Sequence, residues 1–340
     1  MDTFKRSFPT EHLSDLRRNP SVAALFDRWV LPGEQAGDHG LRLAVRNGYL
    51  NFYVKGQSVA ELRMSSSEPR LKLHCKYKEL AVKGSARAVE LGQNYETVRG
   101  DALAIVGQGV VDGWVKTAET YAGDEKRFVD DLVAVTPGVI DLEMALPADK
   151  GSVGRDRVAP RMDLVVAQGT DIAFWEAKCA TNGELRALSP YDEAEDGGYL
   201  HGPHVLWQLR RYQRWVDRPN REKEVRSAYI KCAGLLIAFA ELFGKEGPAL
   251  DCWRALVAAG DTTKVILPPG VVVAGYCPPK AGGKPRDETA TYAARLSSFG
   301  KHRETLERHG ATVTIVADKP SSAILPNLQA GAISKVEQRV

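Results

Sequence analysis

The sequence is poor in cysteine, and the cysteines it has are dispersed. Its five cysteines are Cys75, Cys179, Cys232, Cys252 and Cys277, and no two of them form a Cys-x-x-Cys pair. An odd, scattered set argues against a disulfide framework and favours a reducing cytosol. We therefore expect Cys179 to be a small buried residue rather than a nucleophile.

Other absences narrow the class of protein further. No apolar run is long enough to cross a bilayer, and the first residues, MDTFKRSFPTEHLSDL, do not have the pattern of a signal peptide. We expect a cytoplasmic protein with no membrane partner. The sequence has no Walker-type phosphate loop, no Gly-x-Ser-x-Gly elbow and no dinucleotide fingerprint. The net charge of +3 is too small to indicate nucleic acid by itself.

What the sequence does contain is a hairpin pattern between Arg161 and Lys178, RMDLVVAQGTDIAFWEAK. Two apolar runs flank a Gln-Gly-Thr turn, so the segment predicts two paired strands with Asp163 and Glu176 at one end of a sheet. Glu176 and Lys178 lie on the same face, because side chains along a strand repeat every two residues. Bringing two carboxylates and an ammonium together costs free energy, so such a cluster indicates a function. A divalent cation and a phosphate would supply one.

This arrangement resembles the PD-(D/E)xK nuclease superfamily, with twelve residues between the two acids. The first letter departs from the motif: Met162 precedes Asp163, and the nearest proline is Pro160. The segment Asp124-x-Lys126 also fits the bare letters of the motif, but it lies in a helix-like stretch without a hairpin.

The resemblance implies a metal-dependent deoxyribonuclease that hydrolyses phosphodiester bonds. Asp163 and Glu176, with the carbonyl of Ala177, would bind Mg²⁺ or Mn²⁺. Lys178 would orient the attacking water or stabilise the transition state.

A third acid is expected from an element before the hairpin. Residues 119–135 predict a helix whose apolar stripe consists of Tyr121, Phe128, Leu132 and Val135. Glu125 lies on the same stripe and matches the third acid that the superfamily commonly adds. Asp141 and Glu143, on one face of the predicted strand VIDLEMAL, are alternatives to it.

Residues 204–216, HVLWQLRRYQRWV, predict an amphipathic helix after the hairpin. Gln208 and Tyr212 are one turn apart and resemble the Gln-x-x-x-Tyr motif of RecB-type nucleases. That likeness implies Gln208 near the metal and Tyr212 near DNA, while Arg210 and Arg211 face outward. Some RecB-type members hold an iron–sulfur cluster on four cysteines, but the scattered cysteines here predict none.

Two loops are expected to border the site. The glycine-broken segment 147–161 carries Arg155, Arg157 and Arg161, which we expect to contact phosphates. The segment 189–204 is acidic, and it is interpreted as a gate or a solvent-facing loop. Its His201 and His204 have a spacing compatible with metal binding but are more simply incidental.

The expected fold class is α/β, a mixed central sheet flanked by helices like a restriction-endonuclease core, with an N-terminal β-rich region. Residues 1–100 would hold a helix and a small sheet whose basic face is either solvated or contacts DNA, residues 101–316 the nuclease core, and residues 317–340 a tail. The expected core strands are VIDLEMAL, RMDLVVAQ, IAFWEAK, AYIKCAGLLIAFA, GVVVAGYC and ATVTIVA.

We expect DNA as the partner, with a homodimer or a defence or repair complex as further partners, and a role in genome defence, recombination or repair. Two alternatives stay open. The first is a sequence-specific restriction endonuclease whose N-terminal β region reads the sequence. The second is a catalytically inactive nucleic-acid-binding or scaffold protein.

Overall fold

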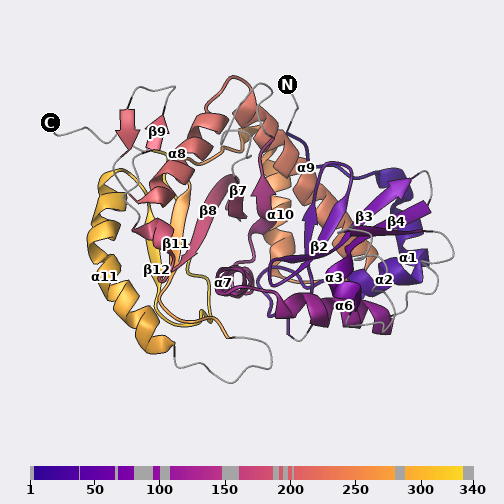
Figure 1. Ribbon diagram of the computed structural model, residues 1–340. Helices are drawn as coiled ribbons and strands as arrows, with labels where there is room; N and C mark the ends of the chain where they lie inside the picture. The colour runs from indigo at the N-terminus through magenta and orange to yellow at the C-terminus, as the bar shows by residue number, and fades with distance from the viewer. Residues whose placement is uncertain are drawn as a thin grey trace.

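Two five-stranded sheets organise the chain, which belongs to the α/β class (Figure 1). The structure is a computed structural model. It describes residues 4–37, 39–65, 68–79, 95–99, 108–147, 161–186, 191–193, 198–200, 203–279 and 288–331.

The first sheet is antiparallel throughout, in the order β1-β2-β3-β4-β5. Its strands are β1 (Arg42–Val45), β2 (Leu50–Val54), β3 (Gln57–Ser65), β4 (Glu68–His74) and β5 (Tyr95–Arg99). The helical elements of this part are η1 (Thr10–His12), α1 (Leu13–Arg18), α2 (Pro20–Asp27), α3 (Cys75–Glu79) and α6 (Gln108–Thr120). The hairpin turns at Asn47-Gly48 and Lys55-Gly56 have positive φ at both glycines.

The second sheet is mixed, in the order β12-β11-β8-β7-β6. Its strands are β6 (Val139–Ala145), β7 (Arg161–Gln168), β8 (Asp171–Cys179), β11 (Gly270–Ala274) and β12 (Val313–Val316). The strands β6, β7 and β8 pair antiparallel, whereas β8, β11 and β12 pair parallel. Five of the six expected core strands are therefore confirmed.

Helices surround this second sheet: α7 (Asp124–Val133), α8 (His204–Val216), α9 (Arg221–Leu242), α10 (Pro248–Ala259) and α11 (Thr289–Arg308). The short elements are η3 (Gly183–Leu185), η4 (Gly260–Thr262), β9 (Tyr191–Glu193) and β10 (Gly198–Leu200). In Figure 1, α11 lies outside β12, while α9 and α10 lie between the two sheets. No helix in the described part of the chain is long and apolar enough to span a membrane.

The expected strand AYIKCAGLLIAFA is wrong, because this segment lies inside the 22-residue helix α9. Its buried residues include Val225, Tyr229, Cys232, Leu236 and Phe239, which are spaced three or four apart. A nearly continuous apolar run fits both a strand and a helix that are buried on most sides, so composition alone does not separate them.

Two smaller expectations also differ from the structure. The helix expected over 119–135 is divided, because α6 ends at Thr120 and α7 begins at Asp124. Tyr121 falls between them, 49% exposed, and is not part of an apolar stripe.

A single hydrophobic core joins the two sheets through α9. Phe4 at the N-terminal end contacts Tyr229 of α9, with ring centroids 5.6 Å apart, and Phe26 of α2 contacts Phe239 of α9 at 5.5 Å. Beyond β12, Leu328 is buried, and its backbone exchanges two hydrogen bonds with the Gln168 side chain. The described part of the tail therefore docks on the β7–β8 hairpin.

Candidate active site

The β7–β8 hairpin brings the two expected acids together. The register pairs Leu164 with Trp175, and one residue further along it sets Asp163 opposite Glu176. The Ala177 N–H donates a hydrogen bond to Asp163 Oδ2 at 2.9 Å, which fixes the carboxylate against β8. Asp163 and Glu176 are only 8% and 5% exposed. Cross-strand partners in an antiparallel pair share a face, so both carboxylates lie on the same side of the sheet.

Lys178 lies among carboxylates. Its Nζ is 2.7 Å from Glu176 Oε1, 2.9 Å from Glu184 Oε2 and 3.7 Å from Glu125 Oε1. Burial alone would lower the pKa of Lys178, but Glu176 and Glu125 outweigh it and raise that pKa above its ordinary value. The ammonium is therefore charged at neutral pH and held in one place.

Glu125 reaches the site from the first turn of α7, as the sequence predicted for the third acid. Asn182, just after β8, donates a hydrogen bond to Glu125 Oε2 at 2.8 Å. Burial raises the pKa of Glu125, and the nearby Asp163 adds to that rise while Lys178 opposes it. Of the acids considered for this role, Glu125 is the one in contact with the lysine of the motif.

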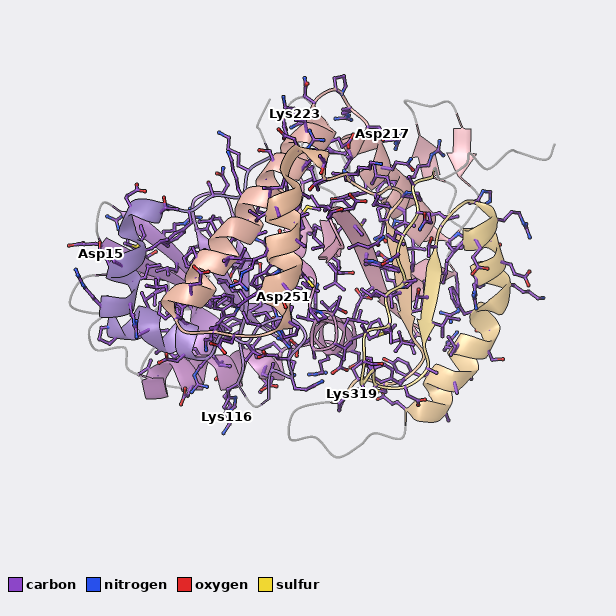
Figure 2. All side chains as sticks on the ribbon, turned by 180° about the vertical axis from the view of Figure 1, so that it is seen from behind. Asp15, Lys116, Asp217, Lys223, Asp251 and Lys319 are labelled. Atoms are coloured by element: carbon purple, nitrogen blue, oxygen red, sulfur yellow. The ribbon has the colours of Figure 1, made fainter. Side chains whose placement is uncertain are left out.

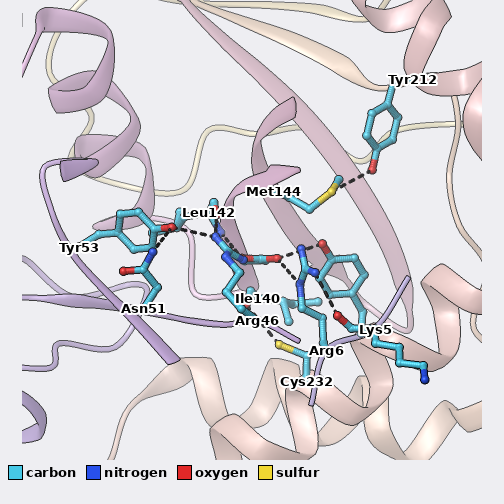
Figure 3. A network of polar contacts seen from close by, with 12 residues as sticks. Lys5, Arg6, Arg46, Asn51, Tyr53, Ile140, Leu142, Met144, Tyr212 and Cys232 are labelled. Carbon is cyan, nitrogen blue, oxygen red and sulfur yellow. Dashed lines mark hydrogen bonds and ion pairs between the residues drawn. The ribbon is translucent and has the colours of Figure 1, made fainter. Parts of the chain in front are cut away.

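Asp141 is not at this site, so its candidacy as third acid is wrong. It is fully buried in a separate network, shown in Figure 3, where Arg6 and Arg46 converge on it. Tyr229 also donates a hydrogen bond to its Oδ2 at 3.1 Å. With two arginines and a tyrosine as partners, this carboxylate is already neutralised and serves the fold.

Glu143 does lie beside the site. The β6–β7 register places it opposite Asp163, because its neighbours Leu142 and Met144 pair with Leu164 and Met162. Lys126 forms an ion pair with Glu143, and the Lys126 Nζ is also 3.8 Å from Asp163 Oδ1. Burial raises the pKa of Glu143, with Asp163 adding to the rise. Glu143 therefore remains an alternative acid on the Asp163 side of the site.

Gln208 and Tyr212 of α8 differ in placement. The Gln208 Nε2 donates to Glu184 Oε2 at 3.4 Å, so the glutamine borders the site as expected. Tyr212 is fully buried, packs on Phe174 with ring centroids 4.9 Å apart, and contacts Met144 Sδ at 3.9 Å. It presents no surface to a ligand, so its expected contact with DNA is wrong.

The arginines expected to bind DNA are in different environments. Arg155 and Arg157 lie outside the described residues. Arg161 begins β7 and is exposed, as a phosphate contact requires. Arg210 is only 9% exposed and does not face outward as expected, whereas Arg211 is partly exposed with its guanidinium over the Trp207 ring at 5.1 Å.

The site has more negative than positive side chains. Its five carboxylates belong to Glu125, Glu143, Asp163, Glu176 and Glu184, and its two ammonium groups to Lys126 and Lys178. Burial raises the pKa of Glu176 well above its ordinary value, and Asp163 raises it further. Such a cluster is stabilised by an added cation.

Two oxygen atoms at the site lack a donor. Glu176 Oε2 and Gln208 Oε1 are both buried without a hydrogen-bond partner. A buried acceptor without a donor costs free energy, and both atoms are oxygens, the ligand type that hard divalent cations prefer. The residues present therefore fit Mg²⁺ or Mn²⁺.

Another group of potential metal ligands is more closely spaced. Among the described residues, one set of three potential metal ligands has all its ligand atoms within 4.8 Å of one another: Asp124, Cys277 and Glu288. Hydrogen bonds already engage it, since Tyr292 donates to Asp124 Oδ2 at 3.0 Å and Cys277 to Glu288 Oε2 at 3.5 Å. Glu125, Asp163 and Glu176 are spaced more widely, with the Lys178 ammonium beside two of them.

Comparisons with protein-family models, curated proteins and solved structures give no match to this chain.

Sequence reasoning missed three residues of the site: Asn182, Glu184 and Lys126. Asn182 accepts a hydrogen bond from the Glu184 N–H at 2.8 Å and begins the turn that places Glu184 beside Lys178. An Asn-Gly-Glu turn directly after the Glu-x-Lys strand was the available signal for the first two. Lys126 was visible only as part of the motif-like letters around Glu125. His204, treated as incidental, lies 3.4 Å from Glu184 Oε1.

Proposed function

We propose that this chain is a metal-dependent DNA nuclease that hydrolyses phosphodiester bonds. Its site would be of the PD-(D/E)xK type on a restriction-endonuclease-like core, and it would act in the cytoplasm in genome defence, recombination or repair. One observation carries the proposal: a single hairpin gathers Asp163, Glu176 and Lys178, and leaves a buried Glu176 oxygen without a donor.

The metal would be held on the hairpin by Asp163, Glu176 and the Ala177 carbonyl, with Glu125 and Gln208 alongside. When bound, Mg²⁺ or Mn²⁺ lowers the pKa of a coordinated water and neutralises charge on the phosphate. The carboxylate, carbonyl and amide oxygens of these residues are hard ligands, which these ions prefer.

The side chains of the chain divide the remaining work. Lys178 donates hydrogen bonds to the attacking water or to the phosphate oxygens, where negative charge grows in the transition state. Glu184 and Glu125 hold the ammonium in position through their contacts of 2.9 and 3.7 Å. Asn182 in turn fixes Glu125, and Gln208 fixes Glu184. Lys126 keeps Glu143 paired beside Asp163.

The proposal is tested by incubating the protein with linear and closed-circular DNA and with RNA, each with Mg²⁺, Mn²⁺ or EDTA. We expect DNA cleavage with either metal and none with EDTA. Attack on linear DNA alone indicates an exonuclease, opening of circles indicates an endonuclease, and discrete fragments favour the restriction-endonuclease alternative. Intact DNA under every metal condition would contradict the proposal and favour the inactive nucleic-acid-binding alternative.

A further inference from the structure

An open pocket of about 570 Å³ lies between the N-terminal segment, the first sheet and the β6–β7 edge. Its lining includes four basic residues: Lys5, Arg6, Arg46 and Arg161. Three of these come from outside the loop in which the sequence analysis sought phosphate contacts. The pocket therefore brings cations together from segments far apart in the chain.

The charges of this pocket are only partly balanced. Lys5 and Arg161 are exposed, and within the described residues neither forms an ion pair. Arg6 and Arg46 share Asp141 as their carboxylate partner, and the buried Arg6 Nη2 has no acceptor. In Figure 3 the Lys5 ammonium points away from that network. An anionic ligand would balance the exposed cations of Lys5 and Arg161.

The pocket adjoins the candidate active site. Glu143 is part of its lining and stands opposite Asp163 across the β6–β7 pair. Gly56, also in the lining, lies against the side chain of Lys126, whose Nζ is 3.8 Å from Asp163 Oδ1. A nucleic-acid chain bound in the pocket would therefore extend to the carboxylates of the candidate site.

A second pocket, of about 530 Å³, continues this basic surface on the other side of the N-terminal segment. The two pockets share Phe4, Lys5 and Arg6, and the second adds Lys223 and Lys231 of α9. Figure 2 shows Lys223 at the outer end of that helix. Glu224 is the acid in its lining, and it already pairs with Arg221 at 2.7 Å.

We propose that the two pockets form one groove for the sugar–phosphate backbone of the DNA strand that is cut, with Lys5 and Arg161 contacting phosphates beside the scissile bond. The inference rests on the proposed nuclease function and adds to it the path of the substrate. It assigns the N-terminal segment a role in binding, because Lys5 lies where the two pockets meet. Cationic side chains that neutralise phosphates release counterions, so their contribution is measurable as salt dependence.

The test measures binding of a fluorescent single-stranded oligonucleotide by anisotropy at several salt concentrations. The protein is the full chain carrying Lys178→Ala, so that no DNA is cut. The variant Lys5→Ala/Arg161→Ala is compared with the control Lys301→Ala/Arg308→Ala. The exposed cations of the control lie on α11, which flanks β12 (Figure 1) at the opposite edge of the second sheet from β6. Thermal unfolding of each variant checks that it folds.

We expect the groove variant to bind at least tenfold more weakly at low salt. Its slope of log K against log salt should also be shallower by about 1.4, since each phosphate contact on a single strand contributes about 0.7. The control should match the parent. Equal slopes for the groove and control variants would overturn the groove. The nuclease proposal would still stand if the protein with Lys178 intact cuts DNA. If the Lys178→Ala parent does not bind DNA and the protein with Lys178 intact does not cut it, both proposals are overturned.

Discussion

At the scale of single residues, the proposed hydrolysis depends on how Lys178 is held. Alternation along β8 was enough to predict that Glu176 and Lys178 share a face, and the hairpin turn was enough to bring Asp163 opposite Glu176. The contacts from Glu184 and Lys126 were not predictable in the same way. The contact of Glu184 depends on a short turn after β8, and that of Lys126 depends on the packing of α7 against β8. Neither follows from strand periodicity.

Replacing Lys178 by alanine should abolish most cleavage while sparing DNA binding. Loss of one donor that stabilises transition-state charge typically costs about 10²–10³ in kcat. Steady-state cleavage and oligonucleotide binding by the same protein check this, with Lys301→Ala on α11 as the matched control. Cleavage at the parental rate would remove Lys178 from the mechanism.

Asp141 should govern acid stability, not catalysis. Burial would raise the pKa of Asp141, but Arg46 and Arg6 outweigh it and hold that pKa below its ordinary value of 3.8. A lowered folded-state pKa means that this stabilisation is present above pH 3.8 and is lost as pH falls through the folded-state pKa.

The variant Asp141→Asn should therefore lose about 3–5 kcal/mol of unfolding free energy at neutral pH, because two buried arginines lose their partner. Its stability should also fall less steeply in acid than that of the parent. Urea unfolding between about pH 2 and pH 7 measures both effects. Parallel pH profiles for the two proteins would show that this ion-pair network is not the source of acid sensitivity.

At the scale of elements, hairpins were easier to predict than the long apolar helix. The turn glycines and the alternation of β7 and β8 are local signals, whereas the strand expected at AYIKCAGLLIAFA became the second half of α9. The polar residues before it, REKE, extend the same helix and make it too long for a strand. The helix is buried on several sides because both sheets pack against it. The local sequence does not indicate this tertiary packing.

The β2–β3 turn should be sensitive to a side chain at Gly56. Gly56 has a φ of +70°, and an added Cβ would lie 2.8 Å from Lys126 Cδ. Gly48 in the β1–β2 turn has a φ of +80° with no atom that close, so it is a matched control for backbone strain.

The left-handed conformation itself should cost about 1–2 kcal/mol in Gly48→Ala. Gly56→Ala should cost more and should also slow cleavage, because Lys126 must move from Glu143 and Asp163. Urea unfolding and cleavage rates of both variants test this. Identical losses in the two variants would show that the contact with Lys126 has no consequence.

At the scale of the whole molecule, the division into an N-terminal region and a core describes the two sheets but not two separate hydrophobic cores. Composition and periodicity gave the α/β class and the mixed second sheet. They did not predict that the two sheets share one hydrophobic core, because the contacts of Phe8 and Phe26 with Phe239 span more than two hundred residues of chain.

Truncating Phe239 should therefore weaken both sheets together. The substitution Phe239→Ala removes a fully buried ring and should cost about 3–5 kcal/mol. Hydrogen exchange should show lower protection in β2 and in β8 alike. Loss of protection confined to one of these strands would contradict the shared core.

The most direct test of the account is the position of Mn²⁺ in a crystal of the protein, located by its anomalous scattering. We predict a peak between Asp163 and Glu176, with carboxylate oxygens at about 2.0–2.4 Å, the range for hard divalent cations and oxygen ligands. Manganese bound at Asp124, Cys277 and Glu288 with none at the hairpin, under conditions where DNA is cut, would contradict it.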